Sequence, residues 1–503
     1  MSTRPGQQAT ALARCEKHAQ SDKGNPNHLA LSQVATLQDR FRRPVESLIA
    51  PQGEPVTFFW RTSIFLFAVT LGTTVAASQA PRVANPAEWT VMVFMNGDND
   101  LEPFAVDNFR QMARVGSTDR VNIVVQFDRL SADNHFTTPD WSQTLRFRVT
   151  KNMEPIPSEA LEDIGEADMG DPQVLQAFVT WARGKFPAKH YMLVIWDHGQ
   201  GYRDLKEQRL HNVKRQQPAS ATVQSGQSLR RPGSYRTISE DVTNNHDKLY
   251  GSEIQGALKN SLGTDKLDVL GYDACLMGMV ETGYSIRSFA RIMVASEELE
   301  PKPGWNYEYW LAPLVQHPET TPAALGKILV EQYARYYAPG SEVENSATTL
   351  SAIDLSKMDE VAKATSVFSE KLISTLASGK VAIQTARDDC QEYAAGSQIY
   401  HIDYGHLLES LRNASTSLEI KAEAQQLINL LSSAVIANYA GSDRQGDWGS
   451  TGLAIYFPKT LTLYTDDPYA ENGYEKSNTF MPVEFVQKER WTDFLHAYWK
   501  AIQ

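Results

Sequence analysis

The chain has few cysteines. Only three occur among its 503 residues, at positions 15, 275 and 390. Small secreted proteins held together by disulfides carry many more, so the sequence excludes a disulfide framework. We expect Cys15 to be absent from the mature chain and Cys390 to be an ordinary free or buried thiol. Cys275 is therefore the cysteine whose surroundings need an explanation.

An excess of basic residues is also absent, because the formal net charge is -12 at pH 7. Nucleic-acid-binding proteins present a basic face, so the composition argues against that class. Acidity is compatible with attraction of basic peptides, although most acidic proteins are merely soluble. Hydrophobic residues make up 42% and charged residues 21%, which is typical of a globular protein with a large core. The length allows two or three domains of about 150 residues each.

The apolar run near the amino end, Ser63–Val75, is shorter than the roughly 20 residues of a transmembrane helix. Arg61 precedes it, and small residues follow at 76–80. This is the layout of a secretory signal peptide, which we assign to residues 56–80. We therefore expect a secreted or periplasmic protein with no stable membrane partner beyond this segment. The alternative is a membrane anchor with a cytoplasmic tail.

A signal peptide normally opens a chain, whereas here residues 1–55 precede it. They are polar and rich in Gln, Ser and Pro, so we interpret them as disordered or not translated. If these residues are not translated, translation would begin at Leu48 or Val56. The mature protein should begin between Ala77 and Val83.

From residue 88 to about 300, short apolar runs alternate with segments of helical periodicity. This alternation predicts an α/β fold with a mainly parallel sheet and helices on both faces. Beyond residue 301 helical segments dominate, so we expect 301–503 to be a more helical region that packs on the core. Helices are predicted at 101–115, 172–186, 252–262, 276–289, 322–337, 356–378 and 418–439.

Residues 203–248 interrupt this pattern. They are polar, rich in Gln, Ser and Pro, and contain the basic pairs Lys214–Arg215 and Arg230–Arg231. Such a segment buries little apolar area, so we predict a mobile surface loop.

Two predicted strands end in reactive side chains. The apolar run Leu267–Leu270 leads to Cys275, and the run that begins at Tyr191 leads to His198. Catalytic groups collect at the carboxyl ends of parallel strands. A thiol with an ordinary pKa of about 8.5 needs a base at neutral pH, and imidazole is suited to that role. The sequence thus favours a Cys–His pair over a merely buried cysteine.

The residues beside this pair suggest how a reaction would be stabilised. Gly199 follows His198, and its backbone can approach a substrate closely. The N–H groups of Gly199 and Cys275 are candidates for binding an oxyanion. We also expect a helix to begin near Leu276 and to place its positive end at the thiolate.

Asp273 lies two positions before Cys275, so in an extended strand both side chains project from one face. A carboxylate there would pair with a substrate Lys or Arg. Equally, it could cap the following helix. Ser296 and Glu297 end the next predicted strand and are further candidates for the pocket, or members of an ordinary solvated loop.

Asp98 and Asp100 alternate like calcium ligands, but the EF-hand spacing stops soon after them. Asp100 is more simply explained as a helix N-cap. Calcium is therefore a possible cofactor, and the sequence requires none.

Several of these motifs resemble the clostripain family of cysteine peptidases, which are caspase-like in fold. They are H-G-Q-G after one strand, D-A-C-L-M after the next, A-S-E-E-L-E-P-K-P-G-W-N-Y, the opening W-T-V-M-V-F-M-N-G-D-N-D-L-E and the closing W-T-D-F-L-H-A-Y-W. The resemblance runs from about Glu88 to the carboxyl end. The long 203–248 segment departs from more compact members.

The resemblance implies a His198–Cys275 dyad, with Asp273 in a pocket for Arg or Lys. It also implies peptide or protein substrates with those residues at the cleavage site. Maturation by self-cleavage between His and Cys is implied too, and Lys214, Arg215, Arg230 and Arg231 are the leading positions. Some relatives depend on calcium. The alternatives are a catalytically silent module that binds basic peptides and a different thiol hydrolase or transpeptidase.

Overall fold

The computed structural model describes residues 86–130, 141–201, 238–394, 400–445, 449–467, 474–478 and 482–503. The expected signal peptide, the extension before it and the four basic residues proposed for processing lie outside these ranges.

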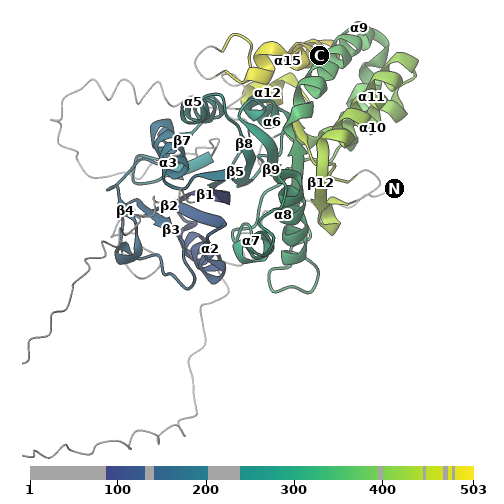
Figure 1. The fold of residues 1–503 in the computed structure, drawn as a ribbon. Coiled ribbons are helices and arrows are strands. Elements are labelled where there is room, and N and C mark those ends of the chain that lie inside the picture. Colours follow the sequence, from purple (N-terminus) through teal and green to yellow (C-terminus); the bar gives the residue numbers. More distant parts are fainter. Residues whose placement is uncertain are drawn as a thin grey trace, which may run out of the picture. The chain divides into compact units, whose positions relative to one another are not determined.

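A nine-stranded sheet forms the centre of the described chain (Figure 1), in the order β12-β10-β9-β8-β5-β1-β2-β3-β4. The five middle strands, from β2 to β9, are parallel, and the pairs at both edges are antiparallel. The prediction of a mainly parallel sheet is therefore confirmed. The strands are β1 (Ala87–Gly97), β2 (Val121–Arg129), β3 (Leu145–Arg148), β4 (Glu162–Asp163), β5 (Ala188–Trp196), β8 (Leu267–Asp273), β9 (Ala290–Ala295), β10 (Thr349–Asp354) and β12 (Val435–Ala440).

Helices cover both faces of this sheet (Figure 1). Along β1, the side chains of Trp89, Val91 and Val93 enter one core and those of Met92 and Phe94 enter the other, as the two-residue period of a strand requires. The first core lies under α2 (Glu102–Val115), α7 (Tyr307–Gln316) and α8 (Pro322–Tyr336). The second lies under α3 (Pro172–Lys185), α5 (Gly251–Leu262), α6 (Val280–Ile286) and α9 (Met358–Asp389).

Residues beyond 301 continue this sheet, because they supply its strands β10 and β12. The predicted helix 418–439 is too long: α11 ends at Ala434, and β12 begins at Val435 and pairs with β10. The remaining elements are α10 (Tyr404–Ala414), α11 (Leu418–Ala434), α12 (Leu461–Asp466), α14 (Glu484–Lys488), α15 (Trp491–Ile502), β11 (His401–Asp403), β13 (Ala454–Tyr456), η2 (Pro157–Glu159), η3 (Leu355–Lys357) and η4 (Ser442–Arg444).

The predicted surface loop 203–248 is also too long at its carboxyl end. Its last residues form a hairpin of β6 (Ile238–Asp241) and β7 (Asp247–Leu249). Ile238 and Leu249 are buried in the core, and Asn96 donates a hydrogen bond to Ser239. These few apolar residues are enough to anchor an otherwise polar stretch. Among the described helices, none is both long and apolar enough to cross a membrane.

Candidate active site

Cys275 and His198 follow neighbouring parallel strands at the same edge of the sheet. Strand β5 pairs with β8 so that their last residues, Trp196 and Asp273, stand opposite each other, and each reactive residue comes two positions after its strand ends. A Cβ on Gly199 would lie 2.5 Å from the Cys275 carbonyl oxygen and 3.0 Å from its nitrogen. Glycine at position 199 therefore allows the two loops to touch.

The Cys275 thiol is half-buried and lies against the backbone of Glu300. The Glu300 N–H donates to Sγ at 3.2 Å. Burial, with the Glu300 carboxylate adding to it, raises the pKa of the thiol to about 12, although the N–H groups of Glu300 and Gly199 oppose this. In this arrangement the thiol is protonated at neutral pH, so its reaction requires a base.

The His198 ring is held by a carboxylate. Its Nε2 lies 2.7 Å from Asp100 Oδ1, and Lys302 Nζ lies 3.0 Å from the other oxygen of Asp100. Burial lowers the pKa of His198, but the hydrogen bond that its ring donates to Asp100 and the charge of Asp197 outweigh this effect, so the pKa lies above its ordinary value. The contacts of the described residues include no hydrogen bond between His198 and Cys275.

Asp100 contacts the catalytic candidate His198, whereas the sequence suggested that it was a calcium ligand or a helix N-cap. The interpretation of Asp100 as an N-cap is wrong, because the N-cap of α2 is Leu101 and no side chain caps this helix. Asp197 contacts the backbone N–H of His198 rather than its ring, and accepts a second hydrogen bond from Asn99. The turn Asn99–Asp100 thus contacts both of the residues that directly follow β5. The sequence feature that could have pointed to Asp100 is the alternation of carboxylates in N-G-D-N-D-L-E.

The helix expected at Leu276 is absent. The chain turns through residues 276–279, Leu276 adopts a φ of 64°, and α6 begins only at Val280. The Leu276 and Gly278 N–H groups instead donate to the carbonyl oxygens of Glu298 and Ser296. A helix terminus therefore does not stabilise the thiolate here.

Asp273 is buried and does not cap a helix. Its carboxylate accepts hydrogen bonds from the Trp305 N–H at 3.1 Å and the Tyr307 hydroxyl at 2.9 Å. Burial raises the pKa of Asp273 to about 7, and it raises that of the adjacent Glu300 carboxyl well above its usual range, with Asp273 adding to the effect. Gly304 permits this packing, because a Cβ there would lie 2.6 Å from Asp273 Oδ1. The buried Asp273 carboxyl and the half-buried Glu300 carboxyl thus lie next to each other, and the backbone of Glu300 contacts the Cys275 thiol.

Sequence reasoning missed Glu300 and named Ser296 and Glu297 instead. The Ser296 hydroxyl is buried against Thr349, and the Glu297 carboxylate accepts a hydrogen bond from the Gly452 N–H. Both side chains thus contact residues of the carboxyl-terminal half, whereas Glu300 contacts the thiol. Only its position in the acidic run S-E-E-L-E distinguished Glu300 in the sequence.

Asp98, the other residue considered as a calcium ligand, lies in a group of four carboxylates with Asp128, Glu166 and Asp241. Burial raises the pKa of Asp241 to about 8, with the charge of Asp98 adding to it. Burial likewise raises the pKa of Glu166 to about 7, and Asp98 contributes there too. Asp100 is not a member of this group.

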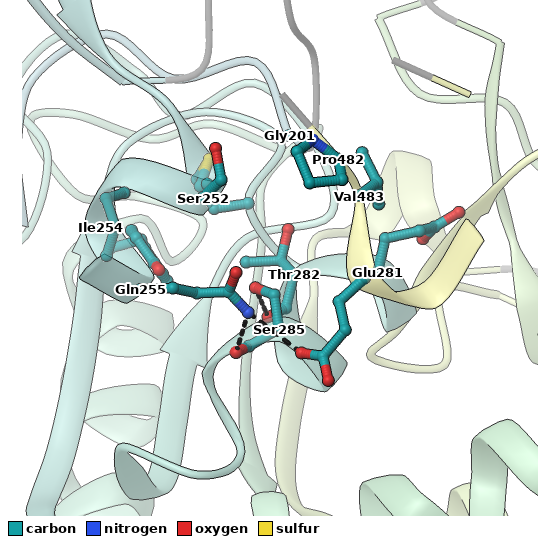
Figure 2. A pocket seen from close by; sticks show the side chains of 13 residues that line it. Gly201, Ser252, Ile254, Gln255, Glu281, Thr282, Ser285, Pro482 and Val483 are labelled. Carbon is teal, nitrogen blue, oxygen red and sulfur yellow. Dashed lines mark hydrogen bonds between the residues drawn. The ribbon is translucent and has the colours of Figure 1, made fainter. Parts of the chain in front are cut away.

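A pocket opens beyond Gly201, between α5, α6 and α14 (Figure 2). Gln255 reaches across it and donates to the Ser285 carbonyl oxygen and to Glu484. Neither His198 nor Cys275 lines this pocket. It is therefore separate from the Cys–His pair.

A model of the clostripain family matches residues 93–216 and 225–499, which is more than half of the chain. Clostripain from Hathewaya histolytica is 27% identical over 236 residues. This stretch covers 44% of the chain and 40% of clostripain, so the chain aligns with less than half of that relative's length.

The fold of this chain resembles those of solved protein structures. A secreted C11 cysteine protease from Bacteroides thetaiotaomicron, in complex with an irreversible peptide inhibitor, is 20% identical with a TM-score of 0.50, covering 73% of this chain and 88% of that one. An inactive zymogen C11 protease from Parabacteroides distasonis is 17% identical with a TM-score of 0.53, covering 82% and 99%. At these identities the likeness shows the fold, and it confirms the expected caspase-like architecture.

Proposed function

This chain belongs to the clostripain family and is a cysteine peptidase, and from that premise we propose that it is a secreted endopeptidase that cleaves after Arg or Lys. The nucleophile is Cys275 and its base is His198. The observation that carries this assignment is the contact between their two loops, in which Gly199 lies directly against the Cys275 backbone.

The chemistry follows from these positions. His198 takes the thiol proton, and the sulfur attacks the carbonyl carbon of the scissile bond. The carbonyl oxygen becomes negatively charged and accepts hydrogen bonds from the N–H groups of Gly199 and Cys275. His198 then protonates the leaving amine, and water cleaves the thioester to release the acid and regenerate the thiol. Asp100 keeps the ring oriented and raises its basicity.

Specificity for basic residues rests on Asp273, to which we add Glu300. A buried carboxyl whose pKa is raised toward neutrality regains a full charge when a cation pairs with it. A substrate Arg or Lys would supply that cation. A substrate with a neutral side chain at this position would leave the pocket carboxyls without a counter-charge, so we expect it not to be cleaved.

The test uses paired reporter peptides with Arg, Lys, Asp or Leu before the scissile bond. The wild type should cleave the Arg and Lys reporters. Cys275→Ala should lower kcat by at least about 10³-fold, whereas Cys390→Ala should not, because the Cys390 thiol is buried and donates to the Ala386 carbonyl oxygen. Asp273→Asn should lose the basic reporters with little change in melting temperature. A silent peptide-binding module would bind these peptides without turnover, and preference for Leu or Asp would refute the specificity.

Secretion is part of the same proposal. The signal-like segment 56–80 would be removed on export, which gives a mature amino terminus between Ala77 and Val83. Mass spectrometry of the protein released by its native host measures this directly. Intact Met1 in a membrane fraction would instead favour the anchor.

A further inference from the structure

The pocket beyond Gly201 is lined by residues of α5 and α6 and by residues at the start of α14 (Figure 2). Gly201 comes three positions after His198 in the chain. Met277, which also lines the pocket, comes two positions after Cys275. Part of the lining therefore belongs to the two loops that carry the proposed catalytic residues, although those residues themselves do not line the pocket.

Two side chains of this lining have a polar atom without a hydrogen-bond partner. They are Glu281 and Thr282, consecutive residues of α6 that are 1% and 6% exposed. The atoms without a partner are Glu281 Oε2 and Thr282 Oγ1. Buried polar atoms of folded proteins are nearly always hydrogen-bonded, so two unsatisfied oxygens at one pocket require an explanation. A ligand in the pocket supplies one.

The Glu281 carboxylate also lacks a counter-charge. Its Oε1 accepts hydrogen bonds from the Tyr474 hydroxyl at 2.8 Å and the Tyr456 N–H at 3.1 Å, which are neutral donors. Among the described residues, the groups that act on this carboxyl include no cation, and burial raises its pKa to about 7. Glu484, the other carboxylate of the lining, is paired with Arg287 at 3.1 Å. Glu281 is therefore the carboxylate that a cation from solution would neutralise.

We propose that this pocket binds a small primary amine with a short aliphatic chain. The ammonium group would donate hydrogen bonds to Glu281 Oε2 and Thr282 Oγ1. The methylene groups would lie against Ile254, Met277 and Val483, the apolar side chains of the same lining. Ammonium fits this site better than guanidinium does. A guanidinium pairs best with both oxygens of a carboxylate, whereas Glu281 Oε1 already accepts two hydrogen bonds.

Direct binding tests this with the full chain carrying Cys275→Ala and Asp273→Asn. The first change prevents peptide cleavage, and the second removes the Asp273 carboxylate, where amines would also bind. Titration with n-butylamine, followed by saturation-transfer NMR at constant ionic strength, should show one saturable site with a Kd of about 0.1–10 mM. Because the readout is binding, it does not depend on whether the proposed peptidase specificity is correct.

Three further ligands test the chemistry of the site. n-Butanol has no charge and n-butylguanidine has the wrong one-to-one geometry, so both should bind at least about tenfold more weakly than n-butylamine. Nα-acetyl-lysine amide presents the same ammonium group on a peptide backbone. Its binding would mean that the site also admits a lysine side chain of a peptide, whereas binding of n-butylamine alone would assign the site to free amines. No saturable binding of n-butylamine up to about 50 mM would overturn the proposal, and equal binding of n-butylguanidine would overturn the preference for ammonium.

Variants of the same chain place the amine in this pocket. Glu281→Gln should weaken n-butylamine binding at least about tenfold, because it removes the charge that receives the ammonium. Thr282→Val should weaken it about threefold or more without lowering the melting temperature, since the Thr282 hydroxyl has no partner in the fold. Glu253→Gln is the matched control, because Glu253 lies on α5 but does not line the pocket, and it should bind n-butylamine normally. If Glu281→Gln and Thr282→Val bind as the control does, the amine binds elsewhere and the proposal is wrong.

Discussion

The partner of the His198 ring is Asp100, an exposed carboxylate. Its hydrogen bond with the ring raises the pKa of the imidazole, whereas burial of the ring lowers that pKa. The same hydrogen bond, with the ring charge and Lys302 adding to it, holds the pKa of Asp100 well below its ordinary range. Asp100 is a positioning residue, because it acts on the substrate only through His198.

Asp100→Asn should lower kcat/KM by about ten- to a hundredfold. Loss of the negative partner favours the neutral imidazole, so the pKa of His198 falls. The limb of the pH–rate profile that reports His198 should therefore move to lower pH. Profiles of kcat/KM for the variant and the wild type measure this shift.

Asp107→Asn is the matched control, since Asp107 is exposed on the nearby helix α2. It should leave both the rate and the profile unchanged. Lost activity in Asp100→Asn with an unmoved profile would mean that Asp100 holds the turn and does not tune the ring.

Among the elements, the last helix stabilises the carboxyl-terminal half. Trp491 on α15 is buried, donates from Nε1 to the Tyr456 carbonyl oxygen at 2.9 Å and packs edge-on against Phe457. Trp499, further along α15, makes a similar bond to the Pro458 carbonyl oxygen. The helix is thus fixed to strand β13 and the residues that follow it.

Trp491→Ala should cost about 3–5 kcal/mol of folding free energy, because it leaves a cavity and an unpaired carbonyl. Thermal melting should show a large decrease. Leu418→Ala, at a residue that is 81% exposed, should stay within about 0.5 kcal/mol of the wild type. Equal melting of the two variants would show that α15 adds little to stability.

For the molecule as a whole, the segment between His198 and Cys275 divides the sheet in sequence but not in space. Strands β1, β2 and β5 precede it, while β8, β9 and β10 follow it, and β5 pairs directly with β8. A chain cut within 203–237 would therefore keep its two pieces together.

We predict self-cleavage in this segment, at Lys214–Arg215 or Arg230–Arg231, because both pairs match the proposed specificity. Purified wild type should give two bands on a denaturing gel and a single peak in size exclusion. Cys275→Ala should remain one band. The same banding in both proteins would mean that another protease makes the cut, or that none is made.

The sequence by itself determined the parallel sheet, its helices and the placement of Cys275 and His198. These follow from local patterns, since apolar runs define the strands and reactive residues come directly after them. The same local patterns predicted some helix boundaries wrongly. Residues 435–439 continue a helical period but pair with β10, and Leu276 begins a turn that long-range hydrogen bonds hold in place of a helix.

Only the tertiary structure decided which acids face which groups. Asp100 reaches His198 across 98 positions of sequence, Glu300 meets Cys275 across 25, and the four carboxylates arrive from four segments. The physical reason is that strand order, register and loop packing bring these side chains together, and these depend on the whole chain. A sequence marks an acid as available, whereas the burial that changes its pKa, and the partner it finds, exist only after folding.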